Sequence, residues 1–357
     1  MSMLLNERGL PGRTALDRYG FIDNAKAIGM VLIVCGHSKG LPAYLSHFIF
    51  SFHVPLFFFI SGFLLKSGKL EASIGNNVQK ILRTLGVPYV LFFLLAWAYW
   101  LATRDIGSKA LLYGDQSWYS PVAGLFTGLD ADLYVDPPLW FFPSLILTAI
   151  VYQVARKWMA LAASTGLFVM AGFILSLLWK YGSYRLPLGL DNMWIALSFY
   201  ALGQYFRERN AFNDVLTGGR QRRGKLVVLL CIALPLLAYA VLLNGKADLG
   251  NMLFGIWPVL YLPSALLGIA AVFSVSLLLP PSRISNWISA NTLTIFPAHF
   301  LCLSLVRGFA VALHVIPDDF NYGLGWNVIS STLAILLCVP LVYFLNRSPV
   351  PLVGNAR

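Results

Sequence analysis

Charge is scarce in this chain, and acidic charge is the scarcest. Only 11% of the 357 residues are charged, with 15 Asp and Glu against 26 Lys and Arg, while 58% are hydrophobic. A soluble globular domain carries about 25% charged residues, so the composition excludes an ordinary soluble protein. We therefore predict an integral membrane protein, because the apolar runs are long enough to cross a hydrocarbon core of about 30 Å.

Cysteine is also scarce, and its pattern excludes the usual cysteine chemistry. The four cysteines lie inside apolar segments and form neither a CxxC pair nor a metal-ligand spacing: Cys35, Cys231, Cys302 and Cys338. We interpret them as small packing residues and expect no metal. The first apolar run also lacks a small-residue cleavage site, so we expect it to be a retained span.

The net charge of +11 does not indicate a nucleic-acid partner, because the basic residues lie in short loops between apolar runs. This is the pattern of the positive-inside rule. The loops expected on the opposite side hold acids instead: Asp105, Asp115, Asp130, Asp132, Asp136, Asp248, Asp318 and Asp319. The alternation predicts an even number of spans, with both chain termini in the cytoplasm.

The apolar runs are continuous rather than alternating, which favours helices over a β-barrel. We predict an all-α protein, a single bundle of about ten transmembrane helices (residues 27–346) between cytoplasmic tails at 1–26 and 347–357. The expected spans are 27–45, 47–65, 84–103, 139–155, 158–179, 190–206, 225–243, 255–279, 290–315 and 325–346. No soluble catalytic domain is visible, so any chemistry must sit in the bundle or at its ends.

Ionisable residues inside a membrane span are costly and point to function. Lys26 and His37 are eleven residues apart, so on a helix they lie within about 20° of one stripe and about 16 Å apart along the axis. Asp23 falls within about 40° of that stripe, just before the expected helix. An extended coenzyme A fits this line, with its phosphates near Lys26 and its thioester near His37; a topology anchor is the alternative for Lys26.

A buried neutral imidazole suits acyl transfer. An alcohol is a poor nucleophile, and an imidazole can take its proton while the oxygen attacks a thioester. Lys and Arg side chains bind phosphate through charge and hydrogen bonds. A hydrogen-bonded structural histidine is the alternative interpretation of His37.

Five segments of the sequence, in order, resemble the membrane acyltransferase 3 family. The first places an aromatic residue and Asp23 ahead of a Lys26-x10-His37 spacing, and the second reads FHVPLFFFISGFL. The third holds a basic pair ahead of Pro-Tyr, the fourth a Trp-Phe element, and the fifth a late histidine. These segments are 21–37, 52–64, 80–89, 139–143 and 291–299. One departure is Lys26, because many members carry Arg there and a bidentate phosphate contact is then lost.

The resemblance implies a donor, an acceptor and roles for several residues. The donor would be cytoplasmic acetyl-CoA, with His37 as the central base and Asp23 beside it in the catalytic set. Lys26, Lys80 and Arg83 would bind the nucleotide phosphates, or serve only as inside anchors.

Three further residues receive roles with open alternatives. His53 could orient the acceptor or steady the reacting oxygen, and His299 is a second catalytic candidate; helix packing is the alternative for both. Trp140 could stack on a sugar or on the cofactor, or anchor the chain at the membrane interface.

The function we favour is an O-acetyltransferase of a bacterial cell inner membrane, acting on an exopolysaccharide, an O-antigen or a lipid-linked oligosaccharide. The chain resembles the stand-alone sugar O-acetyltransferases, described as fucose 4-O-acetyltransferase-like. The rival is a transporter or flippase for lipid-linked sugars. Transporters often show paired repeats with broken helices at the midplane, and we find no such repeat.

Overall fold

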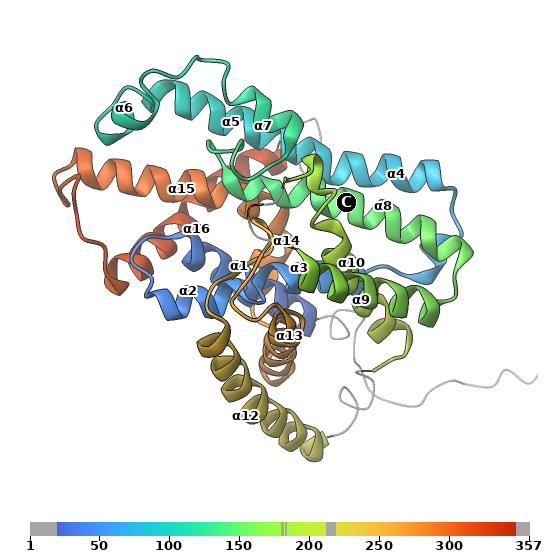
Figure 1. The fold of residues 1–357 in the computed structure, drawn as a ribbon. Helices are drawn as coiled ribbons and strands as arrows, with labels where there is room; N and C mark the ends of the chain where they lie inside the picture. Colours follow the sequence, from blue (N-terminus) through green and yellow to red (C-terminus); the bar gives the residue numbers. More distant parts are fainter. Residues whose placement is uncertain (1–19, 180–181, 183, 212–218, 348–357) are drawn as a thin grey trace, which may run out of the picture.

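The computed structural model describes residues 20–179, 182, 184–211 and 219–347. Most of the expected N-terminal tail, and the C-terminal tail beyond Arg347, lie outside these residues. In the described part, helices dominate, and one two-stranded hairpin is present (Figure 1). The prediction of an all-α bundle is therefore confirmed, apart from the hairpin.

The elements follow one another from α1 at the start of the described chain to α16 at its end (Figure 1). They are α1 (Gly20–His37), α2 (Ala43–Phe50), α3 (His53–Phe63), η1 (Ser67–Leu70), α4 (Ile74–Ile81), η2 (Leu82–Gly86), α5 (Val87–Thr103), α6 (Ser108–Tyr113), α7 (Val122–Thr127), η3 (Pro137–Trp140), α8 (Phe141–Trp158), α9 (Leu161–Leu178), η4 (Pro187–Gly189), α10 (Met193–Glu208), α12 (Gly219–Asn244), β1 (Ala247–Asp248), β2 (Leu253–Phe254), η5 (Pro258–Leu260), α13 (Tyr261–Leu278), α14 (Arg283–Ala290), α15 (Thr292–Ala312) and α16 (Leu324–Arg347).

Eight helical stretches among the described residues are long and apolar enough to cross a membrane, which makes this a multi-pass membrane protein. They are Ala43–Phe63, Ile74–Thr103, Pro137–Trp158, Leu161–Leu178, Arg223–Asn244, Pro258–Leu278, Thr292–Ala312 and Leu324–Arg347. The sequence predicted about ten. The other two expected spans correspond to α1, which carries Asp23 and Lys26, and to α10, which has 16 residues.

The first helix differs from its predicted bounds of 27–45. It begins at Gly20, before both Asp23 and Lys26, and ends at His37. Asp23 lies in the first turn, where a carboxylate is favoured by the helix dipole, and it accepts a 2.5 Å hydrogen bond from Ser289 on α14. The chain then turns at Gly40, whose φ of +88° suits glycine, before α2 begins. The bounds predicted from hydropathy therefore lie too far along the sequence at both ends of this helix.

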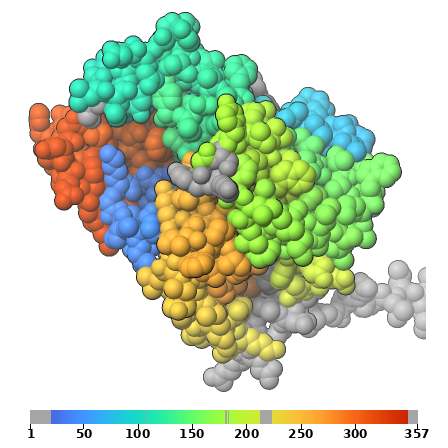
Figure 2. All heavy atoms as spheres, in the orientation of Figure 1, coloured from blue at the N-terminus to red at the C-terminus, as the bar shows by residue number. Residues whose placement is uncertain are grey.

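Helix α1 lies inside the bundle and packs against α3, α13, α14, α15 and α16 (Figure 1). Figure 2 shows α12 and α13 (yellow to orange) reaching one face of the molecule between α1–α3 (blue) and α8–α10 (green). Because α1 contacts helices from both ends of the sequence, it can bring residues of all of them to one site.

Helices α3 and α10 approach each other closely because glycines face across their contact. A Cβ added at Gly203 of α10 would collide with the carbonyl oxygen of Phe59 and the backbone nitrogen of Phe63, and Gly62 of α3 faces the backbone of Tyr200. Small residues allow such backbone contact between membrane helices. Since α3 also carries His53 and lines the cavity described below, this contact fixes one wall of the site.

We predict that Gly203→Ala lowers the free energy of unfolding by about 1–3 kcal/mol, because overpacking forces the two backbones apart. The matched control is Gly166→Ala on α9, where an added Cβ meets nothing within 4 Å. That change should be neutral or raise stability by up to about 1 kcal/mol, from helix propensity. Denaturant unfolding of both variants in detergent measures the difference, and equal stabilities would contradict the close contact.

Candidate functional site

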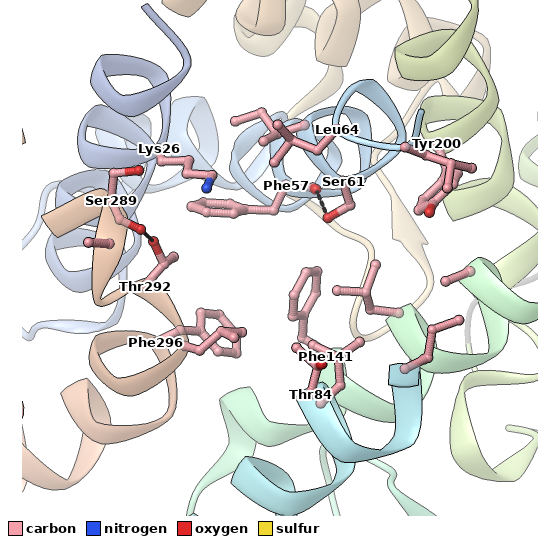
Figure 3. Close-up of a pocket in the computed structure, with 18 of the residues that line it drawn as sticks. Lys26, Phe57, Ser61, Leu64, Thr84, Phe141, Tyr200, Ser289, Thr292 and Phe296 are labelled. Atoms are coloured by element: carbon pink, nitrogen blue, oxygen red, sulfur yellow. Dashed lines mark hydrogen bonds between the residues drawn. The ribbon is translucent and has the colours of Figure 1, made fainter. Parts of the chain in front are cut away.

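A cavity of about 860 Å³ lies between α1, α3, η2, α8, α14 and α15 (Figure 3). At one end it is lined by the charged side chains of Asp23, Lys26, Lys69 and Lys80, which we call the cavity mouth. The other walls are mainly apolar and aromatic: Phe57, Ile60, Leu64, Phe141, Phe142, Leu145, Phe296 and others. The cavity therefore has a positively charged mouth, while its remaining walls are mainly apolar.

Three lysines bring positive charge to the mouth. Figure 3 shows the Lys26 ammonium pointing into the cavity from α1, and Lys80 lines it from α4. Lys69 joins them from η1. Partial burial lowers the pKa of Lys69, and the nearby charges of Lys80, Lys66 and Arg207 lower it further. Positive charges held close together repel one another, and a bound polyanion would relieve this repulsion.

Lys69 was missed as a site residue by the sequence analysis, which did not distinguish it from the other basic residues of the short loops. Nothing in its local sequence separates it from Lys66, because both belong to the same short basic loop. The predicted Arg83 is exposed on η2 and is not among the residues that line the cavity. Its phosphate-binding role stays a prediction.

Asp23 belongs to the mouth. It lines the cavity, accepts the hydrogen bond from Ser289, and acts electrostatically on Lys26 one turn away. It is fourteen residues before His37, which on one helix is about 21 Å. The structure therefore groups Asp23 with Lys26 and not with the imidazole of His37.

Three histidines from three helices meet to form what we call the histidine cluster (His37, His53 and His299). The His37 Nδ1 and His299 Nε2 atoms are 3.3 Å apart, and the two ring centroids are 5.0 Å apart. The rings of His37 and His53 lie 6.2 Å apart, edge to face. His53 and His299 are buried, at 3% and 0% exposure, while His37 keeps some exposure. The sequence predicted each histidine separately, and the fold brings them together.

Backbone carbonyls determine which ring nitrogen of each histidine carries the proton. Nδ1 lies 2.9 Å from the Ile33 carbonyl oxygen in His37, 2.9 Å from that of Ile49 in His53, and within bonding distance of that of Phe296 in His299. A carbonyl only accepts, so Nδ1 must donate. The Nε2 atom of each ring then holds a lone pair.

The Nε2 atom of His37 is therefore the atom available to take a proton. The Nδ1–H of His37 has two acceptors, the Ile33 carbonyl oxygen and the Nε2 lone pair of His299. Among the described residues, no hydrogen-bond partner occupies Nε2 of His37 or of His53. The arrangement presents a neutral imidazole whose basic nitrogen is free and whose other nitrogen is fixed.

Aromatic side chains separate the cavity from the histidine cluster. Phe57, Phe141 and Phe296 line the cavity (Figure 3), whereas none of the three histidines does. The Phe296 ring lies 5.9 Å from that of His299 and 5.0 Å from that of Phe141. The cavity thus ends one ring away from the histidine cluster.

Trp140 lies on η3, with 8% of its surface exposed, and its ring centroid is 6.2 Å from that of Phe141. A Cβ added at Gly250, in the turn of the hairpin, would come within 2.6 Å of the indole. The indole therefore packs beneath the hairpin. Its proposed contact with a sugar or cofactor stays a prediction.

The elements that form the cavity and the histidine cluster all lie within one match to a protein family. The family model described as an acyltransferase domain matches residues 19–345, from the start of α1 almost to the end of α16. This chain belongs to the membrane acyltransferase 3 family. It is therefore a membrane acyltransferase, and both the cavity and the histidine cluster lie within the family domain. No curated protein and no solved structure gives a match to the chain.

One buried acid near Cys302 of α15 was also missed by the sequence analysis. Asp136 directly precedes η3 and is 1% exposed, and both of its carboxylate oxygens are buried without a partner among the described residues. Burial raises the pKa of this carboxyl well above its ordinary 3.8. In the sequence it was one of several acids in a predicted loop, and nothing marked it as buried.

We predict that Asp136→Leu raises the free energy of unfolding by about 1–3 kcal/mol, because it removes an unpartnered buried polar group. A carboxyl whose pKa is raised by folding binds its proton more tightly when folded, so it lowers stability as pH rises above about 4. The gain should therefore be larger at pH 7 than at pH 4.

Unfolding of the wild type and the variant at both pH values measures this effect. The control is Asp132→Leu in the same loop, where the carboxylate accepts a 2.7 Å hydrogen bond from Thr127 and its loss should not stabilise. A loss of stability in Asp136→Leu at pH 7 would show that the carboxyl has a partner.

Proposed function

We propose that this membrane acyltransferase moves an acetyl group from acetyl-CoA to a sugar hydroxyl of an exopolysaccharide, an O-antigen or a lipid-linked oligosaccharide, in a bacterial inner membrane. One observation carries the proposal: α1 joins a cation-lined cavity at Lys26 to a cluster of histidines at His37. A polyanionic thioester and a buried base are what such a reaction requires.

The cavity supports coenzyme A as the donor. The lysines of the mouth carry the charge needed for its phosphates. The apolar walls suit the pantetheine arm and thioester, which carry no charge. Along α1, the rise from Lys26 to His37 is about 16 Å, so the extended arm has a route from the mouth towards the cluster, through the aromatic wall of Phe57, Phe141 and Phe296.

The acceptor hydroxyl reacts at the histidine cluster. His37 Nε2 takes the hydroxyl proton as the hydroxyl oxygen attacks the thioester carbonyl carbon. The resulting tetrahedral intermediate collapses with cleavage of the carbon–sulfur bond, and the sulfur leaves with the proton that His37 had taken. The products are the acetyl ester and free coenzyme A, and the protein returns to its starting protonation.

The other two histidines assist this step. His299 accepts from the Nδ1–H of His37 and so helps hold that ring in one orientation. His53 Nε2, on the adjoining edge, can hydrogen-bond the acceptor hydroxyl or the reacting oxygen. The aromatic wall excludes water, which would otherwise compete with the sugar as the nucleophile.

The purified protein, incubated with radiolabelled acetyl-CoA, should release coenzyme A and transfer label to the extracted surface polysaccharide of the producing cells. We expect His37→Ala to lower kcat by about 10²–10⁴-fold, the usual contribution of a general base. The control is His47→Ala on α2, a histidine outside the cluster.

Coenzyme A should stabilise His37→Ala against unfolding as it does the wild type. This result would show that the variant is folded and still binds the donor. Wild-type activity in this variant would remove the base assignment. Movement of lipid-linked sugar in vesicles without any acetyl chemistry would favour a flippase instead.

The mouth can be tested separately from the chemistry. Lys69→Gln should raise the KM for acetyl-CoA about 5- to 20-fold with little change in kcat, because a charge-assisted contact is worth about 1–2 kcal/mol. Lys66→Gln is the matched control, since Lys66 is in the same loop but does not line the cavity. Steady-state kinetics at low ionic strength measures both, and an equal effect of the two changes would indicate a general field rather than a phosphate contact.

A further inference from the structure

The hairpin lies against the elements that surround the histidine cluster. Its strands pair antiparallel, with Ala247 opposite Phe254 and Asp248 opposite Leu253. Strand β1 packs on α2, and the ring of Phe254 lies 5.0 Å from that of Tyr261 at the start of α13. Helix α13 runs from there to Leu278, close to Pro281 at the wall of the cavity. The hairpin is therefore at the end of the bundle opposite the cavity mouth.

Helix α2 connects the hairpin to the histidines. Phe50, its last residue, has its ring 5.7 Å from that of His37 and 4.8 Å from that of His53. His53 begins α3 three residues further on. Strand β1 therefore rests on the helix whose end contacts two members of the cluster.

The Asp248 carboxylate is held in place by the hairpin itself. Its Oδ1 accepts from the backbone N–H of Asn251 at 3.3 Å, and its Oδ2 accepts from the Asn251 side-chain amide at 3.0 Å. The same amide donates to Asp130 Oδ2 at 3.0 Å. Burial raises the pKa of Asp130, and the negative charge of Asp248 raises it further. Asn251 thus bridges two carboxylates and fixes that of Asp248.

Asp248 is the carboxylate that acts on the cluster. Among the described residues, the groups that interact electrostatically with His37 and His53 are the other histidines of the cluster and Asp248. Of the other acids near the site, Asp23 is at the mouth and Asp136 lies beside Cys302.

Proton transfer to His37 creates a positive charge in an apolar interior, next to two more imidazoles. Such a charge is expensive unless a fixed negative charge or dipole compensates for it. In serine hydrolases an acid that never takes the proton fulfils this role. Here the carboxylate that Asn251 fixes acts on His37 and His53 through its charge, and no hydrogen bond among the described residues joins it to either ring.

We propose that Asp248 is a positioning residue of the acyl transfer, whose fixed carboxylate stabilises the histidine cluster while His37 carries the proton of the acceptor hydroxyl. This inference rests on the proposed function. Asp248 takes no proton itself, because the proton passes from the hydroxyl oxygen to His37 Nε2 and from there to the departing sulfur.

The test uses hydrolysis of acetyl-CoA by the full-length protein in detergent, with water as the acceptor. Asp248→Asn keeps the shape but removes the charge, and we expect kcat to fall at least tenfold with an unchanged KM for acetyl-CoA. Asp248→Glu should recover part of the loss. Asp319→Asn, the same charge change at an exposed loop position, should leave both constants unchanged.

Asn251→Ala separates charge from structure. It removes the side-chain hydrogen bond that fixes Asp248 but leaves the carboxylate, so we expect a loss of kcat of about threefold or less. If Asn251→Ala lowers kcat as much as Asp248→Asn, the hairpin matters only as structure and the proposal is overturned. An unchanged kcat in Asp248→Asn overturns it as well.

The two proposals fail in different ways. If the wild type hydrolyses acetyl-CoA and the Asp248 variants do so at the same rate, the acyltransfer function stands and the role of Asp248 falls. If the wild type neither hydrolyses nor transfers the acetyl group, both are overturned. Stabilisation by coenzyme A, measured for each variant, shows that a loss of kcat is not a loss of the fold.

Discussion

The imidazoles of His37, His53 and His299 each donate their Nδ1–H to a backbone carbonyl three or four residues earlier in the chain. This local hydrogen bond removes the need for a partner from elsewhere and fixes the tautomer of each ring. It also points Nε2 away from its own backbone. Because α3 and α15 both pack on α1, the three rings meet with the Nε2 atoms of His37 and His53 available, and the chemistry that we assign to the site depends on that.

Helix α1 is the element that relates the two halves of the site. Lys26 faces the cavity from its second turn, and His37 ends it. A rigid helix sets the spacing between the cavity mouth and the imidazole of His37 without any contribution from loops. The partners of α1 hold it in place at both ends, with α14 against Asp23 and α15 against His37.

Much of the site could be predicted from the sequence, because its strongest signals are local. The Lys26–His37 spacing needs only the helical repeat, and His53 and His299 stand out because ionisable residues are rare in apolar spans. The helix bounds were less predictable: α1 begins seven residues earlier than expected, since its first turn is polar but packs on α14. Lys69, Asp136 and Asp248 resembled ordinary loop charges, and only the tertiary fold distinguishes them.

The aromatic wall lies between the cavity and the histidine cluster, so it bears on how a donor and an acceptor would reach the histidines. Under the proposed function, the rings of Phe57, Phe141 and Phe296 would keep a thioester in the cavity apart from the histidines and so protect it from hydrolysis. His37 keeps some exposure although it does not line the cavity. The proposed function therefore allows donor and acceptor to reach the cluster by separate routes. The aromatic wall is one ring thick, and an aromatic side chain can turn without any movement of the backbone.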